Sequence, residues 1–275
     1  MFRKRRSTVQ LKTAAEIAKM REAGRIVART LDSLRAAVRP GVTTLDLDAI
    51  AERSIRDAGA VPSFKGYHGF PGSICASVNE EVVHGIPRDT KVLGEGDLIS
   101  IDCGAILDGW HGDSAITVAV GEVSEAERTA MEVCEEAMWR GVAAMRPGNH
   151  LGDIGHAIGG YIDSRGRYGN VQEYGGHGIG TEMHMDPHVL NYGRPGEGMK
   201  LVEGMCLAIE PMVNLGTRRV VQLDDGWTVV TRDARRSTHF EHSVAITADG
   251  PLVLTAREEN RSRLADLGFP DPGFE

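Results

Sequence analysis

Hydrophobic residues recur every three or four positions near the start of the chain, a spacing typical of an amphipathic helix. Thr13-Ala-Ala-Glu16 precedes this stripe and matches a capping box, in which two polar side chains satisfy the first free amides of a helix. The helix must end at Arg39-Pro40-Gly41, because proline cannot continue it. A second helix begins at Thr43 or Thr44 and ends near Gly59. The stripe consists of Ile17, Met20, Ile26, Val27, Leu31, Leu34 and Val38.

The middle of the chain repeats this arrangement. Ser124-Glu-Ala-Glu127 is a second capping box, and its helix ends at Arg146-Pro147-Gly148, after which another helix begins at Leu151. Three sequence features thus occur twice at a nearly constant separation. They are the Arg-Pro-Gly helix stop, a later His-Gly pair, and a strand that ends in a carboxylate. The pattern predicts an internal duplication with pseudo-repeats at about 13–120 and 121–256. Chance agreement of common dipeptides is the alternative.

Residues 98–120 have the pattern of a strand, a turn and a second strand, with Asp108-Gly109 as the turn signal. A two-residue loop would place Asp102 opposite Ala115, with Asp113 on the same face of the ribbon. A shift of one residue would make the two aspartates direct partners. In either register both carboxylates can reach one pair of metal ions. Burial rather than exposure of this ribbon is indicated by Ile99, Ile101 and Ile106.

Composition and charge restrict the class of protein. The chain has 275 residues, enough for a sizeable core, and its 41% hydrophobic and 25% charged residues are ordinary for a soluble globular protein. The net charge of −8 argues against general nucleic-acid binding, so no DNA partner is expected. No apolar stretch approaches the roughly 18 residues that a membrane span needs, so no membrane partner is expected either.

The start of the chain and its cysteines bear on organisation and location. The basic run Arg3-Lys-Arg-Arg6 is not followed by an apolar region, so it is not a secretory signal. Residues 1–12 are expected to form a flexible basic segment and residues 13–275 a single catalytic domain, because no linker separates the two halves. The four scattered cysteines form no CxxC pair, which favours reduced thiols and a cytoplasmic location.

The candidate chemistry lies in four carboxylates and one imidazole: Asp102, Asp113, His177, Glu210 and Glu241. Three of the carboxylates lie in segments that otherwise have the pattern of apolar strands, and a buried carboxylate is costly unless it is paired or bound to a metal. If the four cluster, they repel one another, and two divalent cations would cancel that charge. Oxygen and imidazole ligands without cysteine suit Co, Mn, Fe or Zn, and two-metal sites commonly perform hydrolysis.

Three histidines stand out. His177 lies within Gly175-Gly-His-Gly-Ile-Gly180, where glycine lets the backbone pass close to a ligand. The segment lacks the Gly-Lys-Ser/Thr ending of a phosphate loop. His84 and His184 have no metal-ligand spacing, but a neutral imidazole there can donate to an oxyanion or a scissile amide. A structural or solvated histidine is the alternative for each.

In these segments the chain closely resembles the methionine aminopeptidases of type I, of the bacterial kind. The resemblance covers roughly Thr13 to Ala256 and implies the pita-bread α/β (α+β) fold. In that fold two pseudo-symmetric halves form a curved antiparallel sheet that carries the site, with helices on its outer face. The matching segments are Gly66-Tyr-His-Gly-Phe-Pro71, Ile74-Cys-Ala-Ser-Val-Asn-Glu80, His84-Gly-Ile-Pro87, Asp97-Leu-Ile-Ser-Ile-Asp102, Asp108-Gly-Trp-His-Gly-Asp113, Gly176-His-Gly-Ile-Gly180, Ile209-Glu-Pro-Met212, Asp225-Gly-Trp227 and Phe240-Glu-His242.

The resemblance also implies a reaction, the removal of the initiator methionine from nascent polypeptides with a preference for a small second residue. The five candidate ligands would bind two divalent ions, with Asp113 and Glu241 bridging them, and a water between the ions would attack the scissile carbonyl. Glu210 would carry the proton to the leaving amine. His184 would stabilise the oxyanion, and His84 would contact the scissile nitrogen or help to protonate it.

The methionine pocket is expected from matching positions, with plain core packing as the alternative. Sulfur against aromatic rings suits a thioether side chain. Phe64 stands where close relatives often carry a smaller residue, and Met183 where they carry Phe, which leaves the pocket shape open. His239 replaces a common Gln and changes the hydrogen bonding beside the metals. The expected substrate-binding residues are Tyr67, Phe70, Cys75, His84, Met183, His184 and Trp227.

Two other functions compete with this one. A proline-specific exopeptidase of the same fold usually carries a substantial extra N-terminal domain, whereas about twelve residues precede the first helix here. A non-catalytic binding protein on this scaffold, acting at the ribosome, usually lacks metal ligands that are all present here. The basic start favours a transient ribosome contact, with a merely solvated terminus as the alternative. The expected protein is a cytoplasmic monomer.

Overall fold

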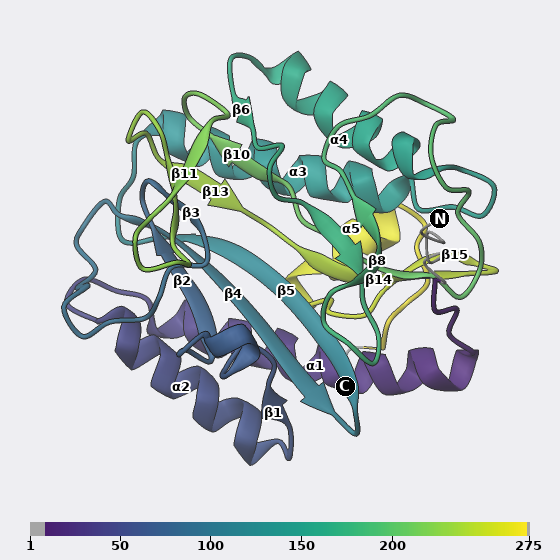
Figure 1. Cartoon of the computed structure of the whole chain (residues 1–275), viewed down its shortest axis with the longest axis horizontal. Coiled ribbons are helices and arrows are strands. Elements are labelled where there is room, and N and C mark those ends of the chain that lie inside the picture. The colour runs from purple at the N-terminus through teal and green to yellow at the C-terminus, as the bar shows by residue number, and fades with distance from the viewer. Residues whose placement is uncertain (1–8, 274–275) are drawn as a thin grey trace, which may run out of the picture.

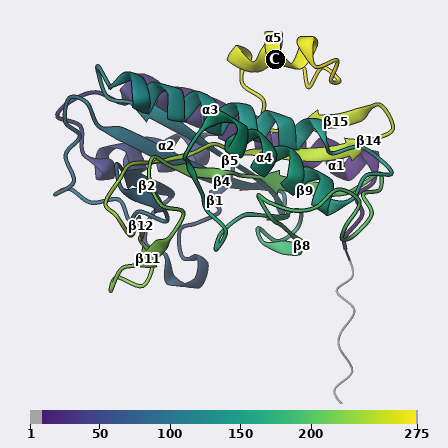
Figure 2. The same ribbon diagram turned by 90° about the horizontal axis from the view of Figure 1, so that it is seen from above.

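The computed structural model describes residues 9–273 of the chain. The predicted flexible segment at residues 1–12 lies mostly outside this range, and Lys12, at its end, donates its backbone amide to the carbonyl of Gly204 at 2.8 Å. Antiparallel strands form a curved layer, and long helices lie along one side of it (Figures 1 and 2). Among the described residues, no helix is long and apolar enough to cross a membrane.

The helices begin at the predicted polar caps. Thr13 and Glu16 form a reciprocal capping box at the start of α1, as Ser124 and Glu127 do at α3. Thr43 caps α2 in the same way. α1 and α3 end before their Arg-Pro-Gly segments, as proline requires. The helices are Ala14–Ala37 (α1), Thr44–Asp57 (α2), Glu125–Ala143 (α3), Leu151–Arg165 (α4) and Arg261–Asp266 (α5), with 3₁₀ turns at Tyr67–Gly69 and Glu258–Asn260.

The strands form four groups whose order does not follow the chain. β4 lies between β1 and β2 and also pairs with β5, while β15-β14-β9-β7-β8 make the longest run. The shorter groups are β13-β10-β6 and β11-β12-β3. The strands are Val61–Pro62 (β1), Ile74–Val78 (β2), Glu81–Val83 (β3), Leu98–Leu107 (β4), Trp110–Ala119 (β5), Gly169–Asn170 (β6), Gly176–Gly178 (β7), Met185–Val189 (β8), Cys206–Ile209 (β9), Met212–Asn214 (β10), Val220–Gln222 (β11), Val229–Thr231 (β12), Ser237–His239 (β13), His242–Thr247 (β14) and Gly250–Val253 (β15).

The β4–β5 hairpin has the register that a two-residue loop predicts. Asp102 pairs with Ala115, and Gly104 pairs with Asp113, so the two aspartates are diagonal neighbours on one face. Asp108 and Gly109 both have positive φ, 49° and 80°, as a type I′ turn requires. The alternative register, with the aspartates as direct partners, is therefore excluded.

Hydrogen bonds join β5 to the segment between β13 and β14. The amide of Glu241 donates to the carbonyl of Ala115 at 3.0 Å, and the hydroxyl of Ser114 donates to the carbonyl of Glu241 at 2.5 Å. Phe240 and Glu241 thus belong to neither strand, since β13 ends at His239 and β14 begins at His242. Glu241 lies in a break, because the chain there changes its pairing partner from β10 to β9.

Two large hydrophobic clusters support the sheet. One draws on α1, α2, β2, β4 and β5, and the other mainly on α3, α4, β9 and β14. Thus each helix pair covers strands from its own part of the chain, and α1 packs directly against β4 and β5. The internal duplication itself remains a prediction.

Candidate metal centre and active site

A cavity of about 980 Å³ opens between the two parts of the sheet. All five predicted metal ligands line it, and so do His84 and His184. The expected methionine-pocket residues line it as well, together with Phe64 and His239. Residues that are far apart in the sequence are therefore brought to one place.

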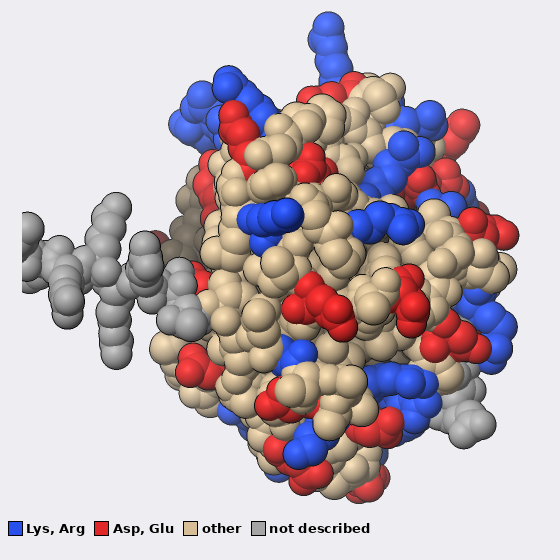
Figure 3. Space-filling view, turned by 90° about the vertical axis from the view of Figure 1, so that its right-hand side faces the viewer, with Lys and Arg blue, Asp and Glu red and all other residues tan. Residues whose placement is uncertain are grey.

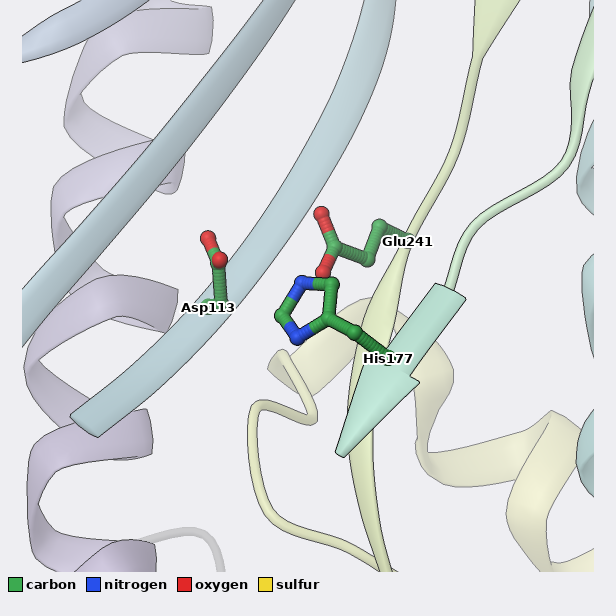
Figure 4. Close-up of side chains that lie close together, drawn as sticks. All are labelled: Asp113, His177 and Glu241. Carbon is green, nitrogen blue, oxygen red and sulfur yellow. The ribbon is translucent and has the colours of Figure 1, made fainter. Parts of the chain in front are cut away.

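Three of the predicted ligands form one group of mutually close side chains. Asp113 comes from β5, His177 from β7 and Glu241 from the break before β14, and one ligand atom of each lies within 4.8 Å of the others. Figure 4 shows the three side chains close together, each from a different segment of the chain. Asp102 on β4 and Glu210 directly after β9 line the same cavity, and Glu210 Oε1 lies 3.4 Å from His177 Nε2.

The glycines around His177 have a local reason. β7 lies between β8 and β9, and backbone carbonyls close to β7 occupy the space that a side chain would need at its two glycines. A Cβ at Gly176 would lie 2.1 Å from the carbonyl oxygen of Ala208, and one at Gly178 would lie 2.3 Å from that of Asp186. Glycine on both sides thus allows a close strand to present the His177 imidazole to the cavity.

The backbone fixes which nitrogen of His177 is free. Its Nδ1 lies 3.0 Å from the carbonyl oxygen of Gly178, which can only accept a hydrogen bond. Nδ1 therefore carries the proton, and Nε2 offers a lone pair on the cavity side, as metal-binding histidines commonly do. Burial lowers the pKa of His177 to about 3, so the ring is neutral at pH 7.

The carboxylates are held in a crowded, poorly solvated place. Burial, and then the negative charge of neighbouring carboxylates, raises the pKa of Asp113, Glu210 and Glu241 well above the usual range. Burial raises the pKa of Asp102 to about 7. Oxygens of Asp102, Asp113 and Glu241 have no hydrogen-bond partner among the described residues. Because buried polar atoms need partners, this set fits divalent cations with oxygen and imidazole ligands.

His184 and His84 line the same cavity as the acidic cluster. His184 Nδ1 is 2.9 Å from the hydroxyl of Tyr67, and its ring centroid is 4.3 Å from that of His177. His84 has a positive φ of 59° and contacts the Trp227 ring edge-on at 6.3 Å between centroids. Burial lowers the pKa of His84 to about 4. Both histidines are therefore placed as neutral hydrogen-bonding groups, with His84 in a backbone conformation that non-glycine residues seldom adopt.

The apolar side of the cavity is a separate small cluster. Phe64, Phe70, Cys75 and Met183 are buried against one another, and Tyr67, Ile86 and Trp227 pack around them. Phe70 and Trp227 meet edge-to-face at 5.1 Å between ring centroids. An apolar recess with aromatic walls therefore lines the same cavity as the acidic cluster.

Some lining residues had no signal of their own in the sequence. Tyr174 and Met212 line the cavity beside the ligands. Tyr174 directly precedes the glycine segment, and Met212 follows the Glu210-Pro211 pair, so proximity to a predicted ligand is the only signal that would have found them. His239 was notable only as a departure from relatives, and here the residue is 1% exposed.

Comparisons with known proteins agree with this geometry. Residues 18–248 match the model of metallopeptidase family M24. The methionine aminopeptidase 1 of Mycobacterium tuberculosis is 54% identical over 255 residues, which cover 91% of this chain and 96% of that protein. The crystal structure of a methionine aminopeptidase from Thermotoga maritima superposes with a TM-score of 0.89 at 43% identity and covers 91% of this chain and 100% of that one.

The proline-specific relatives are less similar. A prolidase from Pyrococcus furiosus superposes with a TM-score of 0.74 at 26% identity, covering 90% of this chain but 66% of that one. The expected pita-bread fold is confirmed by both sets of structures, and the use of divalent metal follows from the family and the acidic cluster. The chain therefore belongs to metallopeptidase family M24 and, within it, to the methionine aminopeptidases.

Proposed function

We propose that this protein removes the N-terminal methionine from nascent polypeptides by metal-dependent hydrolysis. The observation that carries the proposal is the junction of two unlike surfaces in one cavity. An acidic cluster with an imidazole lies on one side, and a recess of aromatic and sulfur-containing side chains lies on the other. The first suits a metal and the second suits a methionine side chain.

Two divalent ions, of Co, Mn, Fe or Zn, would be held by Asp102, Asp113, His177, Glu210 and Glu241. When bound, such ions supply Lewis acidity and lower the pKa of water, which makes hydroxide available as a nucleophile near pH 7. The negative charge of the four carboxylates would balance the positive charge of two divalent ions. Without cations, burial and mutual repulsion raise the pKa of these carboxyls and favour their protonated forms. Asp113, His177 and Glu241, whose ligand atoms lie within 4.8 Å of one another, would form the centre of this ligand set.

The chain's own groups would divide the remaining work. The recess around Phe70 and Met183 orients the methionine side chain and excludes water from it. Glu210 would take a proton from the attacking water and deliver it to the leaving amine. His184 would donate a hydrogen bond to the developing oxyanion, and His84 would contact the scissile nitrogen.

The hydrogen bond to Tyr67 supports the role of His184. If the Tyr67 hydroxyl donates to Nδ1, that nitrogen is the acceptor, and the neutral ring carries its proton on Nε2. The Nε2–H group is then the donor that an oxyanion needs. Tyr67 would thus serve the methionine recess with its ring and His184 with its hydroxyl.

A comparison of peptides tests the proposed function against the proline-specific alternative. Protein stripped of metal and reloaded separately with Mn, Fe, Co or Zn should release methionine from Met-Ala-Ser and leave Ala-Pro-Ser intact. Met-Ala-Ser should also be cleaved faster than Met-Phe-Ser, since a small second residue is expected. Cleavage only ahead of proline would overturn the proposal in favour of the prolidase-like reaction.

We also propose where in the cell this activity takes place and which partners the protein has. A cytoplasmic location is supported by four free, buried cysteines, and the net charge of −8 gives no reason to expect a DNA partner. On the face in Figure 3, acidic and basic side chains are interspersed rather than gathered by sign. We propose a monomer with a transient ribosome contact through Arg3–Arg6, which lie outside the described residues. Salt-sensitive co-sedimentation with ribosomes, with and without residues 1–8, tests that contact, and no change on deletion would exclude it.

A further inference from the structure

His239 is a buried polar side chain for which the proposed reaction has no role. It ends β13, two residues before Glu241, and its side chain lines the cavity. Its Nε2 is shielded from solvent and has no hydrogen-bond partner among the described residues. Burial of an unpaired polar nitrogen costs free energy, so a partner is expected when the site is complete.

The nearest candidate partner is Glu210. His239 Nε2 lies 3.8 Å from Glu210 Oε2, while Glu210 Oε1 lies 3.4 Å from His177 Nε2. The carboxylate thus lies between two imidazoles, with one oxygen facing each. His177 has no proton on Nε2, because its Nδ1 donates to the backbone, so it cannot donate to Glu210. His239 is the imidazole that can.

We propose that His239 is a positioning residue that donates an Nε2–H hydrogen bond to Glu210 Oε2. The inference rests on the proposed function, in which Glu210 is a metal ligand. The bond requires the 3.8 Å separation to shorten to about 3.0 Å. The bond would occupy Oε2 and leave Oε1, beside His177, free to bind a metal ion.

Direct ligation by His239 is the competing role. Two ligand atoms on one ion also lie roughly 3–4 Å apart, given metal–ligand distances of about 2.0–2.2 Å. However, among the described residues the carboxylate oxygen within 4.0 Å of His239 Nε2 is Glu210 Oε2, whereas the other oxygen of that carboxylate, Oε1, is the one beside His177. Ligating carboxylates are commonly held by an outer hydrogen bond, and losing it typically weakens metal binding. The geometry therefore favours the donor role.

Metal titration of three variants tests the donor role. Calorimetry with Zn²⁺ and Mn²⁺ on metal-free protein should show binding about 10- to 100-fold weaker for His239→Leu, which keeps bulk but loses the donor. His239→Gln, whose amide can still donate, should remain near the wild-type affinity. His156→Gln, at an exposed position on α4, is the matched control and should not change it. If His239→Leu does not fold, His239→Asn, whose amide is too short to reach, takes its place.

X-ray absorption of the zinc-loaded protein separates the two roles. One imidazole per site in both wild type and His239→Leu, together with weaker binding by the variant, supports the donor role. Wild-type affinity in His239→Leu or His239→Asn overturns it. A second imidazole that is lost in the variant also overturns it and makes His239 a ligand. Failure of the wild type to bind metal would instead contradict the proposed function.

Discussion

Metal binding should displace protons from the acidic cluster. In the metal-free chain, burial and mutual repulsion raise the pKa of Asp113, Glu210 and Glu241 well above the usual range, so at pH 7 they take up protons more readily than ordinary carboxyls do. Asp102, with its pKa raised to about 7 by burial, is about half protonated there. A bound cation requires the ionised forms, so metal and protons compete for the same oxygens.

The direction and size of the effect follow from these shifts. A carboxyl whose folded pKa is raised stays protonated until the pH passes that pKa, so metal affinity should increase as the pH rises from 6 to 8. Each displaced proton tightens the apparent Kd about tenfold per pH unit, or about 1.4 kcal/mol. His177 contributes no proton in this range, because its pKa of about 3 leaves it neutral already.

Calorimetry measures the proton count directly. Titration of Zn²⁺ into metal-free protein in buffers of different ionisation enthalpy gives the number of protons released, which should be at least one at pH 7. Asp113→Asn should release fewer protons and bind more weakly, whereas the exposed Asp89→Asn should match the wild type. An observed enthalpy that does not depend on the buffer, with the same Kd at pH 6 and pH 8, would refute the reasoning.

Three further predictions concern single residues. His84→Ala should lower kcat about 100-fold with little loss of bound metal; a loss of activity that merely follows metal content would contradict this. Tyr67→Phe should lower kcat about 2- to 10-fold with little change in KM, and ¹⁵N NMR of the zinc-loaded protein should show the Nε2–H form of His184 weakened; an unchanged ring spectrum would exclude the tautomer role. Gly112→Ala should cost about 1–3 kcal/mol in urea unfolding, because its Cβ would lie 2.7 Å from the backbone of α1, whereas Gly160→Ala on α4 has room and should cost nothing.

Local features of the fold were predictable from the sequence. The helix ends followed from capping boxes and Arg-Pro-Gly segments, since both act through the backbone of a few neighbouring residues. The β4–β5 register followed from the Asp108-Gly109 turn. The order of strands was not predictable, because it depends on pairing between distant segments. The break at Glu241 has the same origin, a change of pairing partner that no local pattern records.

The candidate site was predictable as a set of residues but not as an arrangement. Four carboxylates, three of them in apolar segments, indicated a shared set of cations, and the structure places all four around one cavity. The distances between Glu210 and its two imidazole neighbours arise only when β7, β9 and β13 come together. The position of His239 beside Glu210 could not be predicted from the sequence, because it depends on how the strands pair rather than on the neighbours of His239 in the chain.

Methionine release from Met-Ala-Ser is the most direct test of the central claim. Metal-free protein should be inactive, protein reloaded with a suitable divalent ion should release free methionine, and Glu210→Ala reloaded in the same way should not. Bound metal is measured in each sample, so that a loss of turnover is not mistaken for a loss of metal. A metal-loaded wild type that releases no methionine, or a Glu210→Ala variant that turns over at the normal rate, would contradict the account.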